Sequence, residues 1–148
     1  MIKNERQYRI TKSQAQRFER ALARIQSPPT DQDGTAQAIH PLLRKAEEDA
    51  LNSQLEDLRR QLGEYEDLAK GGQETFVSHS FEDLPNALIR ARIAAGLSQK
   101  DLAERLGLKE QQVQRYEATE YSSASLERVK AVIRALGVTV REEVSFVR

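Results

Sequence analysis

Apolar residues recur at helical intervals in the N-terminal part of the chain. Four of them are three or four positions apart and share one face of a predicted helix: Ala15, Phe18, Leu22 and Ile25. Thr11 followed by Gln14 has the spacing of a capping box, so we expect this helix to begin at Thr11. It should end at Ser27, because two prolines follow. Residues 30–35 have the composition of a loop.

A longer apolar stripe lies between residues 41 and 69. Its positions alternate at intervals of four and three, as in a heptad repeat: Leu51, Leu55, Leu58, Leu62, Tyr65 and Ala69. The helix should end at Gly71, a typical C-cap residue. Such a stripe must pack against a partner. The sequence allows three partners: the first helix, a second copy of the chain or another protein. Residues 1–72 are therefore predicted to be a helical hairpin or coiled-coil region for dimerisation or partner binding.

The remaining chain divides into a linker, a helical domain and a tail. Residues 73–84 are predicted to be a linker, within which 74–81 form a short strand or stay extended. Residues 85–138 have the pattern of several short helices. Residues 139–148 form a strand-like tail: Val140, Val144 and Phe146 alternate on one face, although Glu142 interrupts it.

Composition excludes several classes of protein. Only 39% of the 148 residues are hydrophobic, and the longest apolar runs are far shorter than a membrane span of about 20 residues. The charged N-terminus lacks a secretory signal, so we expect a cytoplasmic protein that does not bind membranes. Without cysteine, and with only His40 and His79, no metal or cofactor is expected. No catalytic motif is present, so an enzyme is not expected.

Charge is balanced over the whole chain but not within its parts. The chain has 23 basic and 23 acidic residues, yet residues 1–30 hold seven basic and two acidic groups. Residues 44–70 hold five basic and eight acidic groups. The basic N-terminal segment is either a solvated helix face or an arm that contacts DNA, and its charge alone does not decide between them.

The most informative segment is residues 91–117, which predicts two short helices joined by a tight turn. Ser98 is a good N-cap for the first helix, and Gly107 supplies the left-handed conformation that ends it. In the second helix, Val113 is the main apolar contact. Gln111 and Arg115 then lie on the opposite face, and both side-chain types read base edges in a DNA major groove.

This segment resembles the helix-turn-helix of the XRE/Cro family, to which many phage repressors belong. The positions that carry the resemblance agree in order and spacing: Arg92, Gly96, Leu97, Ser98, Gln99, Leu102, Ala103, Gly107, Val113 and Glu117. The resemblance covers about residues 85–138 and implies a lambda-repressor-like domain of five helices. The predicted fold is therefore mainly α-helical, with a helical N-terminal region and a short strand allowed in the tail.

The resemblance also implies roles for individual residues. Arg92 and Glu117 should form an ion pair that joins the first helix of the domain to the recognition helix. Gln99 should bind a DNA phosphate. The expected DNA-contacting residues are Gln99, Lys100, Lys109, Glu110, Gln111, Gln112, Gln114, Arg115, Tyr121, Ser122 and Ser123. Two features depart from the family: the loop 118–124 lacks the usual Gly and Pro, and Glu110 places an acid toward the groove.

These residues predict a sequence-specific regulator of transcription that binds a double-stranded DNA operator, as a repressor and a homodimer. Residues 80–137 hold nine basic and eight acidic groups, so a single domain should bind weakly and a dimer would compensate. The alternative is an antitoxin, because a helical region ahead of this module also resembles antitoxins of the host-inhibition-of-growth type. Such a protein neutralises a cognate toxin by direct contact and represses its own operon.

Overall fold

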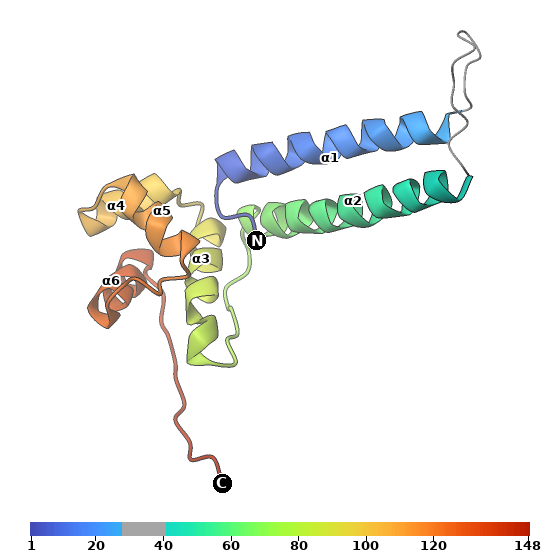
Figure 1. The fold of residues 1–148 in the computed structure, drawn as a ribbon. Helices are drawn as coiled ribbons and strands as arrows, with labels where there is room; N and C mark the ends of the chain where they lie inside the picture. The colour runs from blue at the N-terminus through green and yellow to red at the C-terminus, as the bar shows by residue number, and fades with distance from the viewer. Residues whose placement is uncertain (28–40) are drawn as a thin grey trace. The chain divides into compact units, whose positions relative to one another are not determined.

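A computed structural model describes residues 1–27 and 41–148, which form two compact units, 1–64 and 65–148 (Figure 1). The predicted loop at 30–35 and His40 lie outside the described residues. The described elements are α1 (Glu5–Gln26), α2 (Pro41–Ala69), the 3-10 turn η1 (Phe81–Asp83), α3 (Leu84–Ala94), α4 (Gln99–Leu106), α5 (Glu110–Ala118) and α6 (Leu126–Leu136). None of these helices is long and apolar enough to cross a membrane.

Helix α1 begins at Glu5, so the predicted start at Thr11 was wrong. The Asn4 side chain accepts a hydrogen bond from the Gln7 amide at 2.8 Å, and the Gln7 side chain accepts one from the Lys3 amide at 2.8 Å. This cap satisfies backbone donors about two turns earlier than Thr11, which lies inside the helix. The helix ends as predicted, with Ser27 as its C-cap.

The first unit is an antiparallel hairpin of α1 and the larger part of α2 (Figure 1). Its buried core is Ala15, Leu22 and Leu55, and the residues packed around it are Phe18, Leu51, Leu58 and Leu62. Two polar contacts fix the register: Gln26 with Glu48 at 2.8 Å, and Arg59 with Glu19 at 2.9 Å. The apolar stripe of α2, which we call the leucine stripe, contributes Leu51, Leu55, Leu58 and Leu62 to this core. Of the three partners that the sequence allowed for it, the first helix is therefore the one that covers it.

The end of α2 belongs to the second unit. Tyr65 and Leu68 pack in the core of that unit, so the predicted stripe is divided between two cores. The helix ends as predicted, because Gly71 adopts a left-handed conformation with φ +72° and donates a hydrogen bond to the Leu68 carbonyl at 3.0 Å.

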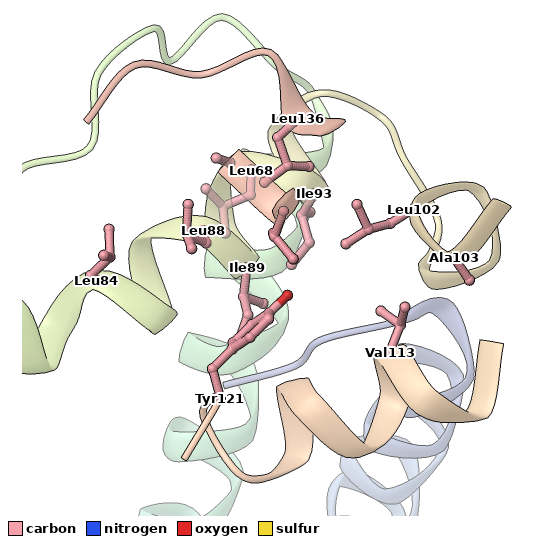
Figure 2. Packing of buried hydrophobic residues seen from close by; sticks show 12 residues of the cluster. Leu68, Leu84, Leu88, Ile89, Ile93, Leu102, Ala103, Val113, Tyr121 and Leu136 are labelled. Atoms are coloured by element: carbon pink, nitrogen blue, oxygen red, sulfur yellow. The ribbon is translucent and has the colours of Figure 1, made fainter. Parts of the chain in front are cut away.

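The core of the second unit is formed by α3–α6 and the end of α2 (Figure 2). Its buried residues are Leu68, Leu84, Leu88, Ile89, Ala91, Ile93, Leu102, Ala103, Val113, Tyr121, Val132 and Leu136. In α4, Ser98 and Asp101 form a reciprocal capping box, and the hydrogen bond from Ser98 lowers the pKa of Asp101. Gly107, with φ +68°, turns the chain into α5. The second unit contains the 3-10 helix η1 and four complete α-helices, so it is helical as expected.

The strands allowed by the sequence at 74–81 and in the tail do not form in the described part of the chain. Phe76, Val138 and Val140 pack against the core of the second unit instead. Beyond them the tail has no adjacent strand edge to pair with, and Val144 and Phe146 are 97% and 92% exposed. An alternating pattern favours a strand only where a partner supplies the hydrogen bonds, so residues 139–148 remain extended.

Candidate nucleic-acid interface

Helix α5 has a buried face and an exposed face. Val113 and Glu117 are four residues apart, so they project on the same side, where they are 1% and 0% exposed. Gln111 and Arg115 lie on the opposite side and are exposed. Neither side chain has a hydrogen-bond or ion-pair partner within the described residues. The helix therefore presents an amide and a guanidinium that are free to bind another molecule.

The other polar groups of α5 are partly occupied by contacts within the helix. The side-chain oxygen Oε1 of Gln112 accepts a hydrogen bond from the Lys109 backbone amide at 3.0 Å, which caps the helix. The Gln114 amide donates to the Glu110 carboxylate at 3.1 Å. Glu110 is thus held by a neighbour on its own helix. This hydrogen bond competes with any contact of Gln114 to a base.

A buried polar cluster connects α3, α4 and α5. Arg92 Nε donates to Glu117 Oε1 at 2.6 Å and Arg92 Nη2 donates to Glu117 Oε2 at 2.8 Å, in a two-pronged ion pair. The side chains of this pair are 3% and 0% exposed. Arg92 Nη1 also donates to the Leu97 carbonyl at 2.7 Å. The ion pair expected from the sequence is present, and it joins α3 to α5.

Gln99 is also a member of this buried cluster, whereas we expected it to contact DNA. Its side chain is 4% exposed, and Nε2 donates to Glu117 Oε2 at 2.7 Å. Because Gln99 is buried, a direct bond from its side chain to a DNA phosphate would require the side chain to change its conformation. The spacing did hold a signal, because Gln99 precedes the inward-facing Leu102 and Ala103 by three and four residues and so shares their face.

Tyr121 does not lie on the surface of the loop where DNA contact was expected. It is 5% exposed, and its ring stacks on Tyr116 with centroids 6.0 Å apart. Burial, reinforced by the nearby negative charge of Glu117, raises the pKa of Tyr121. Ser122 and Ser123 are exposed, and the Ser123 hydroxyl shares a hydrogen bond of 3.2 Å with the Thr119 hydroxyl. Tyr121 is therefore a core residue that anchors the loop.

The loop after α5 compensates for the glycine it lacks. Glu120 and Tyr121 adopt left-handed conformations with φ +50° and +58°, which cost about 1–3 kcal/mol each in residues other than glycine. The Tyr121 amide donates to the Tyr116 carbonyl at 2.7 Å, and the buried ring of Tyr121 adds packing. These contacts hold the strained turn in place and define the path of the loop that the sequence left open.

Lys100 and Lys109, both expected to contact DNA, are exposed. Lys100 lies in the first turn of α4, and Lys109 is the N-cap of α5. Together with Ser122 and Ser123 they are polar groups of the kind that bind phosphates around a recognition helix. No three His, Asp or Glu side chains in residues 1–27 and 41–148 gather closely enough to hold a metal ion.

Comparison with known proteins agrees with this geometry. Residues 88–142, which span the last seven residues of α3 and the whole of α4–α6, match the helix-turn-helix family model HTH_3. The domain is an XRE-type helix-turn-helix. The match supports a DNA-binding regulator of transcription, a class that is generally not enzymatic. No curated protein and no solved structure matched the chain.

Proposed function

We propose that the chain is a sequence-specific regulator of transcription that binds double-stranded DNA in the cytoplasm, as a repressor and a homodimer. The observation that carries this proposal is the pair Gln111 and Arg115, exposed on a helix whose other face is fixed by Val113 and Glu117. Arginine binds guanine and glutamine binds adenine through paired hydrogen bonds in the major groove. The helix is held rigidly while its reading side chains remain free.

The surrounding residues supply contacts that position the helix on DNA. Lys100, Lys109, Ser122 and Ser123 bind phosphates and do not read the sequence. Gln99 supports recognition indirectly, because its amide holds Glu117 and thereby α5. Glu110 and Gln114 contact the groove only where a cytosine amino group or an adenine competes with the hydrogen bond between them.

A homodimer suits this domain because one copy has little positive charge. A two-fold dimer places two recognition helices about 34 Å apart, one DNA turn. The leucine stripe of α2 is already covered by α1, whereas Val144 and Phe146 of the tail are exposed. The tail is therefore the surface through which we propose that two copies associate, by pairing of their extended segments.

Base reading is tested by selecting a binding site from a random DNA library and measuring affinity by fluorescence anisotropy. Arg115→Ala and Gln111→Ala should each weaken binding to the selected site by about 5- to 150-fold, equivalent to roughly 1–3 kcal/mol. Binding to random DNA should change much less. Arg134→Ala removes an exposed arginine from α6 and is the matched control. Equal losses on both DNAs for Arg115→Ala would contradict the proposed position of α5.

The antitoxin alternative is favoured by one observation: residues 1–64 form a compact unit of their own, outside the helix-turn-helix. Such a unit is suited to bind a toxin while the other unit binds DNA. The test is co-expression with the product of the neighbouring reading frame. Suppression of its toxicity that requires residues 1–64 and survives Arg115→Ala would support an antitoxin. An unaffected or non-toxic neighbour would leave the regulator as the function.

A further inference from the structure

Five arginines occupy one side of α1. At 100° per residue they fall within about 80° of one another around the helix axis. They are Arg6, Arg9, Arg17, Arg20 and Arg24, and all five are exposed. The buried residues Ala15 and Leu22 lie on the opposite side, against α2. Five of the seven basic residues of the N-terminal segment thus form a single stripe on the outer face of the hairpin, which we call the arginine stripe.

The charge of the arginine stripe is not neutralised by the hairpin. The two acids of α1, Glu5 and Glu19, fall outside its arc, and Glu19 pairs with Arg59 of α2. Within the described residues, Arg9, Arg17 and Arg24 make no ion pair. Arg20 donates to the backbone carbonyl of Gln16 at 3.3 Å, which leaves its charge uncompensated.

The composition of the stripe distinguishes between possible partners. A helix that enters a membrane surface needs large apolar residues beside its basic ones, and α1 has no large apolar residue within this arc, since Ile10 lies about 20° outside it. A protein interface needs an apolar centre with few charges, which the stripe also lacks. Single-stranded nucleic acid is bound through stacked aromatic rings, and no Phe, Tyr or Trp lies within the arc.

A duplex backbone fits the remaining properties. From Arg6 to Arg24 the stripe is about 27 Å long at 1.5 Å per residue. Duplex DNA carries a negative charge about every 1.7 Å along its axis, and guanidinium groups bind phosphates through paired hydrogen bonds. Ser13, between the two halves of the stripe, is exposed and adds a hydroxyl donor of the kind that binds phosphate oxygens.

We propose that the arginine stripe is a second, sequence-independent binding site for the sugar-phosphate backbone of double-stranded nucleic acid, separate from the base-reading face of α5. It supplies five positive charges to a protein whose residues 80–137 have a surplus of one. The site is built on the hairpin alone, so its binding does not depend on sequence recognition by α5.

The test measures binding of the full chain to a random-sequence duplex between 50 and 200 mM salt. The stripe variant is Arg9→Gln/Arg17→Gln/Arg24→Gln, and the matched control Arg44→Gln/Lys45→Gln/Arg60→Gln removes the same charge from α2. Each lost phosphate contact lowers the salt slope by about 0.9. The fourfold rise in salt should therefore weaken the wild type about 40-fold more than the stripe variant. The control should behave as the wild type.

Other outcomes overturn the proposal in distinct ways. An unchanged salt slope in the stripe variant, or an equal change in the control, rules out the site. Loss of binding to poly-glutamate without loss on the duplex would assign the stripe to an acidic protein partner. Binding of Arg115→Ala to the selected DNA sequence distinguishes the two proposals. If this variant no longer discriminates the selected DNA from random DNA while the stripe variant binds both normally, the proposed function stands and this inference fails. Circular dichroism verifies that both triple variants are folded.

Discussion

Removal of Arg92 tests the contact on which the orientation of α5 depends. In the wild type, Glu117 is fully buried and accepts hydrogen bonds from two nitrogens of Arg92 and from Gln99. Arg92→Ala removes the cation and leaves a buried carboxylate that has lost its counter-charge. Breaking a buried pair on one side costs about 3–5 kcal/mol, because burial of the remaining charge is no longer offset.

The size of this effect makes it easy to measure. The second unit has 84 residues, for which 1 kcal/mol shifts the melting temperature by about 4–8 °C. Arg92→Ala should therefore lower the melting temperature by at least about 12 °C. Glu117→Gln should cost less, since the amide keeps the shape and its oxygen still accepts a hydrogen bond. The double variant Arg92→Met/Glu117→Met removes both charges and should recover part of the loss.

Tyrosine fluorescence is a suitable signal, because three of the four tyrosines lie in the second unit and the chain has no tryptophan. Lys130→Ala breaks the exposed ion pair with Glu127 and is the control, for which we expect an unchanged midpoint. Unchanged midpoints for both Arg92→Ala and Glu117→Gln would refute the reasoning. A double variant less stable than Arg92→Ala would show that the loss comes from packing and not from an unpaired charge.

Three further predictions follow from burial and exposure. Leu55→Ala should destabilise the helical hairpin by about 2–5 kcal/mol in urea unfolding, because Leu55 packs against α1 and is only 4% exposed. An unchanged unfolding midpoint would show that the leucine stripe does not pack on α1. Val144→Asp/Phe146→Asp should convert a dimer into a monomer in light scattering without altering the circular dichroism; a persistent dimer would move the interface elsewhere. Tyr121 should ionise only on unfolding: its pKa is raised in the folded state, so its stabilising contribution is complete below about pH 10 and is lost as the pH rises further. Absorbance at 295 nm should accordingly show one tyrosine titrating with alkaline unfolding, and Tyr121→Phe should remove that step.

The sequence predicted the features that depend on local spacing. The intervals in α2, the Ser98 cap and the left-handed Gly107 are each determined within a few residues, and the structure contains them. The same holds for the exposure of Gln111 and Arg115, which follows from the inward position of Val113. The start of α1 was misplaced because two similar caps lie within seven residues of each other, and the earlier one is used.

Features that depend on distant contacts could not be predicted in this way. The composition of the loop after α5 did not reveal that the Tyr121 ring reaches back to Tyr116 and stabilises two left-handed residues. The tail has the alternation of a strand, but a strand also needs an edge to pair with. The leucine stripe requires a partner without specifying it, so its packing on α1 emerged only from the fold.

The buried cluster of Arg92, Gln99 and Glu117 explains how a small domain can hold α5, the proposed reading helix, in a fixed orientation. The apolar contacts of Val113 and Tyr116 with the core are not directional, so on their own they restrain the rotation of α5 about its axis only loosely. Glu117, one turn after Val113, is held from α3 by Arg92 and from α4 by Gln99, along two different directions. The orientation of the face that carries Gln111 and Arg115 is therefore fixed before DNA binds. Binding then does not lose free energy to ordering this helix. It also follows that a loss of the Glu117 contacts should reduce discrimination between DNA sequences more than it reduces binding to phosphates, because only the former requires the rotation of α5 to be fixed.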